Sequence, residues 1–189
     1  MQPDSFATWA PDSARQAADF TVRLAGPGDV EACVRLVTAL GVGPEARWRS
    51  TLTRTVRDGR DRALFVAEAT GDVVAYGRVV RFQPDPATPE TAPPGWYLLG
   101  LVVNPAWRRR GIGEVLTKAR MAWVAEHADR IYYFTGPENR VSQELHQRLG
   151  FTPLAGTWVP PGGRPEDAQH QRFYCAPLAG RQAGGNARH

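Results

Sequence analysis

The stretch that decides the fold runs from Leu101 to Gly113 and reads LVVNPAWRRRGIG. It closes an apolar run that begins at Trp96, and such a continuous run predicts a strand buried on both faces. Asn104-Pro105 ends that strand, because proline has no N–H to donate to a neighbouring strand. Helical spacing of apolar residues begins directly after the three arginines and the glycine that follows them. The stretch therefore predicts a strand, a short loop, a glycine turn and a helix start.

The turn before the predicted helix has the features of an anion site. The first turn of a helix leaves backbone N–H groups without partners inside the helix, and these donors attract anions together with the helix dipole. Gly111 and Gly113 let a diphosphate approach the backbone without a Cβ in the way, and Arg108, Arg109 and Arg110 add positive charge. A helix start with solvated arginines is the other interpretation, because short glycine motifs are weak alone.

Two better-known phosphate motifs do not fit this turn. A Walker loop needs a Gly-Lys-Ser/Thr sequence, and none follows Gly113. A dinucleotide-binding fingerprint needs three glycines close behind the strand, but here one is missing and the others lie too far beyond Val103. The order of strand, loop, turn and helix still provides the context that a phosphate cradle requires.

The rest of the chain alternates between helical and strand-like patterns. Residues 83–95 interrupt them with five prolines, so we expect a stiff surface loop there. The predicted strands are 21–24, 63–69, 73–82, 96–103, 131–135, 151–159 and 172–176, and the predicted helices are 27–40, 48–59, 112–123 and 141–149. This order predicts an α/β (α+β) fold with a mixed sheet and crossover helices.

Length and composition favour one domain. The 189 residues are 42% hydrophobic and 22% charged, which supports a packed core rather than disorder. We expect an irregular leader at residues 1–20, one domain at 21–178 and a flexible tail at 179–189.

Charge, cysteines and apolar windows exclude several classes. The net charge is +4 and the arginines are spread along the chain, so we expect no nucleic-acid partner. Cys33 and Cys175 are too few for a disulfide scaffold, and we expect both in the core. No window approaches the roughly 20 apolar residues of a membrane span, and the first residues lack the apolar stretch of a signal peptide. We therefore expect a soluble, cytoplasmic protein with no membrane partner and no metal site.

The central stretch resembles motif A of the GNAT superfamily of N-acetyltransferases. The hallmark of that motif is Q/R-x-x-G-x-G/A, which is met here by Arg108, Gly111 and Gly113. Downstream, the family has an asparagine and then a helix that ends in Gly-Phe, which is matched by Asn139 and by Leu149-Gly150-Phe151. The similarity covers about residues 21–176.

The resemblance implies a GNAT fold and acetyl-CoA as cosubstrate. The family's sheet is central, mixed, mostly antiparallel and twisted, with about seven strands and four helices, and two strands splay apart at the acyl-CoA site. The end of the strand before the turn holds the pantetheine arm, the turn holds the pyrophosphate, and the asparagine contacts the arm or caps the next helix. The matching residues are Leu101, Val102, Val103, Arg108, Arg109, Arg110, Gly111, Ile112, Gly113, Glu114 and Asn139.

The chain departs from the family at the proton donor. The usual donor is a tyrosine four residues before Gly-Phe, and His146 occupies that position. Histidine titrates near neutral pH, so we expect His146 to be the general acid, and a structural histidine is the alternative. On this hypothesis His146→Phe lowers turnover more than it raises the KM for acetyl-CoA. Glu68 and Glu138 are weak candidates for a general base, and loss of the amine proton to water is the alternative.

The sequence says least about the acceptor amine. Acidic residues in two variable loops, Asp85, Glu90, Glu166 and Asp167, would attract a cationic amine if they lined the acceptor pocket. Trp48, Trp96, Tyr97 and Trp158 are expected either to cover the acceptor or to pack in the core. We expect a small-molecule primary amine, such as an aminoglycoside-like antibiotic or a polyamine. A peptide or protein amine, or a non-catalytic acyl-CoA sensor, is the alternative, and the resemblance also implies a possible homodimer.

Overall fold

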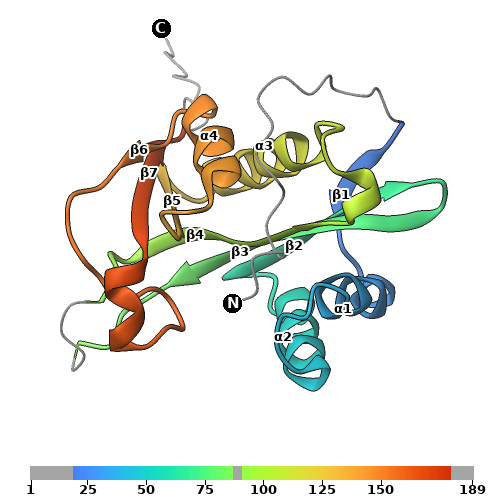
Figure 1. The fold of residues 1–189 in the computed structure, drawn as a ribbon, viewed down its shortest axis with the longest axis horizontal. Helices are drawn as coiled ribbons and strands as arrows, with labels where there is room; N and C mark the ends of the chain where they lie inside the picture. Colours follow the sequence, from blue (N-terminus) through green and yellow to red (C-terminus); the bar gives the residue numbers. More distant parts are fainter. Residues whose placement is uncertain (1–18, 87–90, 180–189) are drawn as a thin grey trace, which may run out of the picture.

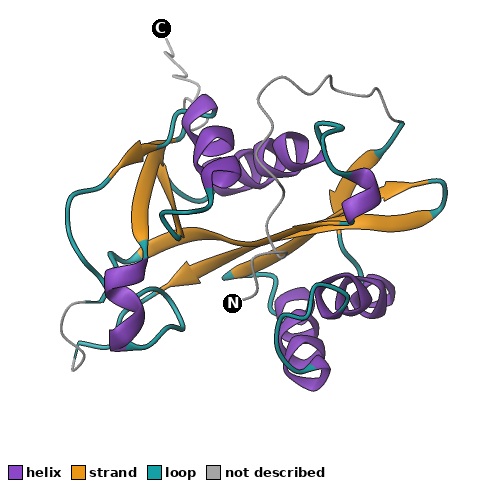
Figure 2. Cartoon of the chain, viewed as in Figure 1, coloured by secondary structure: helices purple, strands orange, loops and turns teal. Residues whose placement is uncertain are grey.

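The computed structural model describes residues 19–86 and 91–179. The expected leader lies outside the described residues apart from Asp19 and Phe20, and so does the expected tail apart from Ala179. The helices and strands occupy the positions that the sequence patterns predict, with one exception near the C-terminus (Figure 2). They are β1 (Thr21–Leu24), α1 (Val30–Thr38), α2 (Glu45–Arg57), β2 (Arg62–Ala69), β3 (Asp72–Phe82), β4 (Gly95–Val103), α3 (Ile112–Ala125), β5 (Arg130–Thr135), α4 (Arg140–Arg148), β6 (Thr152–Pro153) and β7 (Arg172–Pro177).

Within the described residues the strands form a seven-stranded sheet in the order β1-β2-β3-β4-β5-β7-β6. Only β4 and β5 are parallel, and the other neighbours are antiparallel. The β2–β3 hairpin turns at Thr70 and Gly71, whose φ angles of 53° and 85° suit a tight hairpin turn. The predicted mixed, mostly antiparallel sheet with crossover helices is therefore confirmed.

Helices cover both faces of the sheet (Figure 1). One face carries α3 and α4, where Leu116 and Phe151 are fully buried in the larger core cluster. The other face carries α1 and α2, where Leu52, Val66 and Cys33 are fully buried. Cys33 is thus a core residue as predicted, and both cysteines are free.

The strands β4 and β5 separate halfway along β4. Their registered pairs are Tyr97 with Tyr132 and Leu98 with Tyr133 only. Just beyond these pairs, the register between β3 and β4 shifts, and Gly100 has a φ of 56° that favours glycine. The bulge turns the second half of β4 away from β5, so the splayed strands that the resemblance implies are present.

Two predictions about strands are wrong. The strand at 96–103 is not buried on both faces, because Gly100 is exposed and Leu99 is only half-buried where β5 has moved away. The strand expected at 151–159 shortens to β6, at the edge of the sheet. Pro153 has no N–H for a ladder bond, and Gly156 turns the chain with a φ of 133°. The loop expected at 160–169 contains a short 3-10 helix, Pro165–His170.

Candidate functional site

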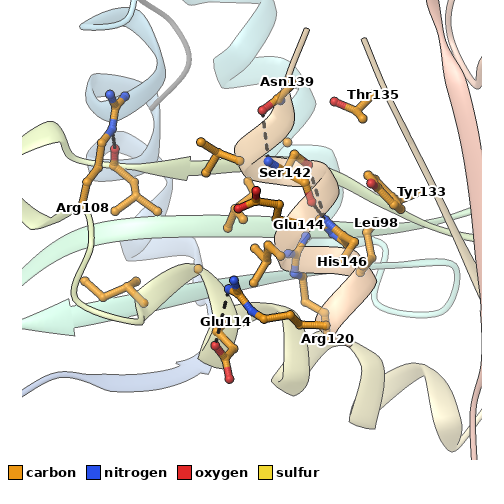
Figure 3. A pocket seen from close by; sticks show the side chains of 18 of the residues that line it. Leu98, Arg108, Glu114, Arg120, Tyr133, Thr135, Asn139, Ser142, Glu144 and His146 are labelled. Atoms are coloured by element: carbon orange, nitrogen blue, oxygen red, sulfur yellow. Dashed lines mark hydrogen bonds and ion pairs between the residues drawn. The ribbon is translucent and has the colours of Figure 1, made fainter. Parts of the chain in front are cut away.

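A cavity of about 430 Å³ lies where β4 and β5 separate, and α3 and α4 complete its walls (Figure 3). This volume is within the usual range for a small-molecule site. Ten of the residues proposed from the sequence line it, namely Leu101, Val103, Arg108, Arg109, Gly111, Ile112, Gly113, Glu114, Asn139 and His146. The structure thus brings together residues from β4, the glycine turn, α3 and α4 that lie up to about one quarter of the chain apart.

The start of α3 lies where the sequence predicts an anion cradle. Gly111 caps the helix with a φ of 84°, and its carbonyl accepts from the amides of Glu114 and Val115 at 3.0 and 3.1 Å. The earlier amides of the helix have no acceptor inside it, so they are available to an anion. A Cβ at Gly113 would lie 3.5 Å from Leu101, so a side chain there would grow into the narrow space between strand and helix. This cradle fits a diphosphate held by backbone N–H groups.

Two of the residues proposed to bind acetyl-CoA point away from the cavity. Val102 faces the opposite side of the sheet and packs in the core under α1 and α2. The Arg110 guanidinium lies over the Trp107 ring at 4.7 Å and is not part of the cavity lining. Arg108 lines the cavity and its Nε donates to the Val103 carbonyl at 3.4 Å (Figure 3).

Asn139 caps α4 from the rim of the cavity. Its Oδ1 accepts from the Ser142 amide at 3.2 Å, which satisfies one of the unpaired donors of the helix (Figure 3). The side-chain NH₂ group is left to other partners, so capping and contact with a ligand are compatible.

His146 is held as a neutral imidazole. It is 3% exposed, and its Nδ1 lies 2.7 Å from the Ser142 carbonyl oxygen (Figure 3). A carbonyl only accepts, so Nδ1 carries the proton and Nε2 is bare. Nε2 is buried and has no hydrogen-bond partner within the described residues. Burial lowers the pKa of His146 to about 3, with a smaller contribution from the positive charge of Arg120.

This tautomer bears on the expected role of His146. A neutral ring with its proton on Nδ1 has none to give from Nε2, so the geometry does not favour a general acid here, although that role stays a prediction. The Ser142 hydroxyl lies 3.4 Å from Nδ1, but Nδ1 has no free lone pair to activate it. His146 and Ser142 therefore do not form a nucleophile–base pair.

The cavity wall contains a buried arginine that was not predicted from the sequence as a site residue. Arg120 of α3 is 1% exposed, and its partners are the Leu116 carbonyl, the Thr117 hydroxyl and the Arg78 carbonyl at 3.2, 2.9 and 3.3 Å. Burial lowers its pKa, but a guanidinium remains charged at neutral pH. It lies across Gly77, where an added Cβ would be 2.8 Å from the guanidinium carbon. Its burial could have been predicted from its position four residues after Leu116, which places both residues on the helix face that meets the sheet.

The remaining candidates lie outside the cavity lining. Glu68 pairs with Arg23 at 2.9 Å, and Glu138 is exposed, so neither is placed as a base. The loop acids Asp85, Glu166 and Asp167 do not line the cavity, and Glu90 lies outside the described residues. The aromatic candidates mainly pack in the protein: Trp96 against Trp123, Tyr97 against Tyr132, Trp158 against Phe173 and Trp48 against Arg78.

The described residues contain neither a metal-ligand cluster nor a membrane-spanning helix. In residues 19–86 and 91–179, no three His, Cys, Asp or Glu side chains come together as metal ligands would. In the same ranges, every helix is too short or too polar to cross a membrane.

Comparison with known proteins identifies relatives of this chain. Residues 34–151 match the model of the acetyltransferase (GNAT) family. An aminoglycoside N(6')-acetyltransferase type 1 of Stenotrophomonas maltophilia is 30% identical over 133 residues, which are 69% of this chain and 85% of that enzyme. Its namesake in Salmonella typhimurium is 32% identical over 90 residues, 47% of this chain and 61% of the relative.

Solved structures share the fold at low identity. A phosphinothricin acetyltransferase of Sinorhizobium meliloti in complex with acetyl-CoA has a TM-score of 0.64 at 18% identity, over 86% of this chain and 90% of that one. A ribosomal-protein-alanine N-acetyltransferase of Brucella melitensis has a TM-score of 0.64 at 21% identity, over 84% and 99%. The chain belongs to the GNAT family of acetyltransferases. It is an acyltransferase that uses acetyl-CoA, as the resemblance of its turn implies.

Proposed function

We propose that this protein transfers the acetyl group of acetyl-CoA to a primary amine of a small molecule, such as an aminoglycoside-like compound or a polyamine. The observation that carries the proposal is the cavity itself. It joins the amide cradle at the start of α3 to the opening between β4 and β5, so one ligand can have its diphosphate at Gly111 and its acyl end near Leu98. The names of the relatives from Stenotrophomonas and Salmonella support the choice of amine.

We propose direct attack of the amine on the thioester in a ternary complex. The alternative route, through an acyl-enzyme, needs an activated nucleophile in the cavity. Cys33 lies in the core under α1 and α2, and Cys175 lies on β7 outside the lining. Ser142 lines the cavity but lacks a base, because Nδ1 of His146 is protonated. The amine therefore meets the acetyl carbon without a covalent intermediate.

An amine panel tests the proposal. Thiol release from acetyl-CoA is measured with an aminoglycoside, spermidine, a peptide with a free N-terminus and a lysine-containing peptide, and products are identified by mass. Acetylated aminoglycoside or polyamine is the expected result, and turnover of the peptides alone would replace the small-molecule proposal. Tight acetyl-CoA binding without any acetylated product would indicate a sensor. Gly113→Val is the matched control, because its side chain fills the cradle.

Assembly and location complete the proposal. We propose a cytoplasmic protein, supported by the two free cysteines and by the need for acetyl-CoA. We propose that the protein binds no nucleic acid, because its basic residues are spread along the chain rather than clustered. We also propose a homodimer, for which the family resemblance is the support. Sedimentation analysis tests the dimer, and a nucleic-acid role would appear as binding with a steep salt dependence.

A further inference from the structure

Arg78, beside the acyl end of the cavity, lacks an acidic partner among the described residues. It lies on β3, opposite Leu99 of β4, and its side chain is on the face of the sheet that carries α1 and α2 (Figure 1). Its Nε is buried and has no hydrogen-bond partner in the part of the chain that the structure describes. The other charged side chains near it, Arg54 and Arg62, are also positive. Burial lowers the pKa of Arg78, but a guanidinium stays charged at neutral pH, so an anionic ligand would supply the missing counter-charge.

The guanidinium of Arg78 packs against a tryptophan and a glycine. Its Cζ lies 5.6 Å from the centroid of the Trp48 ring, and the Trp48 Nε1 in turn donates to the Val42 carbonyl, which fixes that ring. A Cβ at Gly100 would lie only 3.3 Å from the Arg78 Nε, so the absence of a side chain there makes room for the guanidinium. The side chain of Arg78 is nevertheless only half-buried. Since Nε is the nitrogen that is closed off, solvent reaches the outer end of the guanidinium.

The acceptor has to reach the acetyl group from the side on which Arg78 lies. In the proposed complex, acetyl-CoA occupies the cavity that α3 and α4 wall on one face of the sheet. The way that remains open to the amine is the gap between β4 and β5 on the opposite face. Leu99 and Gly100 line this gap, and Gly100 is exposed. An amine that has its nitrogen at the acetyl carbon therefore places its other atoms beside these two residues, within reach of Arg78.

We propose that Arg78 selects the acceptor by pairing with a carboxylate that the acceptor carries beside its primary amine. The planar fork of a guanidinium matches the two oxygens of a carboxylate, and such charge-assisted hydrogen bonds are strong. An amino acid is the simplest molecule that has both groups. The inference rests on the proposed acetyl transfer to a small primary amine and narrows that class. Arg54, Arg62 and Arg78 attract a carboxylate, whereas they repel an acceptor that carries positive charges only.

A purely structural role for Arg78 has a different consequence. If the guanidinium only packs on Trp48, its loss weakens the fold and lowers the activity toward every amine by one factor. If it binds a carboxylate, its loss affects only the acceptors that carry one. The decisive quantity is therefore the ratio of kcat/KM for two acceptors that differ in the carboxylate alone.

Matched acceptors measure this ratio. The common amino acids are assayed by thiol release from acetyl-CoA, and the best of them is compared with the amine that lacks only its carboxylate, as phenethylamine does beside phenylalanine. Arg78→Gln is expected to lower kcat/KM for the amino acid about 10- to 100-fold, the usual range for lost hydrogen bonds to a charged group, mostly through KM. The kcat/KM for the decarboxylated amine and the KM for acetyl-CoA are expected to stay level.

Two further variants serve as controls. Arg81→Gln removes an exposed arginine of the same strand that pairs with Asp61, and it is expected to keep the wild-type ratio. Arg78→Lys keeps the positive charge without the planar fork, so its ratio is expected to lie between those of the wild type and Arg78→Gln. It also preserves the test if Arg78→Gln folds poorly.

The carboxylate subsite is overturned if the wild type uses the decarboxylated amine as well as the amino acid, or if Arg78→Gln lowers both values by the same factor. Either result, together with acetylation of an aminoglycoside or spermidine, would leave acetyl transfer to a small amine intact and remove Arg78 alone.

Calorimetry decides on Arg78 if no amine is acetylated, a result that would count against acetyl transfer to small amines separately. Each amino acid is titrated into the protein saturated with CoA. Binding to the wild type and to Arg81→Gln but not to Arg78→Gln supports the subsite. Equal binding to all three proteins, or none to the wild type, overturns it.

Discussion

The buried histidine makes the stability of this protein depend on pH in a way that one substitution can isolate. His146 has a pKa of about 3 in the folded state and an ordinary value of 6.5 when exposed. Between these values the unfolded chain binds a proton that the folded chain does not. Stability therefore rises with pH across this window and is lost as pH falls below about 6.5.

The magnitude follows from the two pKa values. A full proton difference changes the free energy of unfolding by about 1.4 kcal/mol per pH unit. Integrated from about pH 7.5 to about pH 5, the loss due to His146 is about 2 kcal/mol. The result hardly changes with the folded-state pKa provided that it lies well below 5, because the titration of the unfolded state sets the loss. Burial disfavours a charged imidazolium in the folded state, and the positive charge of Arg120 adds a smaller effect.

The assay is urea unfolding of the wild type and His146→Phe at several pH values and constant ionic strength. The absolute stabilities of the two proteins can differ, but the comparison cancels every other titrating group. The wild type is expected to lose about 2 kcal/mol more than the variant between about pH 7.5 and about pH 5. Equal losses would show that His146 accepts a proton in the folded protein, and would return it to consideration as an acid.

Three further pairs of substitutions test the glycine turn, the α4 cap and the core. Gly111→Ala, at a φ of 84° with open space around it, is expected to cost about 1–2 kcal/mol and to weaken acetyl-CoA binding, whereas Gly162→Ala, equally open at 73°, should match only the stability loss. Asn139→Ala is expected to lose about 1 kcal/mol with the α4 cap, while Asn139→Asp keeps the cap and tests the amide for ligand contact by acetyl-CoA affinity. Leu116→Ala is expected to cost about 2–5 kcal/mol in urea unfolding, against almost nothing for Val115→Ala on the exposed face. Equal acetyl-CoA affinities in the two glycine variants, or equal stabilities in the last pair, would contradict these assignments.

Local sequence patterns predicted most of the helices and strands, because the residues that define each element lie close together in the sequence. The periodic spacing of Ile112, Leu116 and Trp123 placed α3, and the glycine turn placed its start. The prediction of a strand at 151–159 was wrong because it followed the apolar composition of the segment. Pro153 and Gly156 constrain the backbone there and end the strand pairing.

The site was predictable where the motif is contiguous and not where it depends on three-dimensional packing. The turn from Arg108 to Glu114 could be read directly. That Arg110 lies over Trp107 and that Val102 points into the core under α1 and α2 both depend on local side-chain directions. Tyr133 and Arg120 belong to the cavity only because β5 and α3 meet α4 in space. The tautomer of His146 follows from one hydrogen bond to a carbonyl, which no sequence pattern encodes.

Because Arg120 packs directly across Gly77, substitutions at positions 77 and 120 can occur in only one order. With Arg120 in place, any side chain at position 77 collides with a guanidinium that is enclosed on all sides. Shortening position 120 first removes the collision, and position 77 then becomes free to vary. The two positions therefore change in a fixed order during evolution. Arg120 must be replaced before Gly77 can vary, and an arginine can appear at position 120 only after position 77 is glycine. Relatives that lack glycine at position 77 are accordingly expected to carry a smaller residue at position 120.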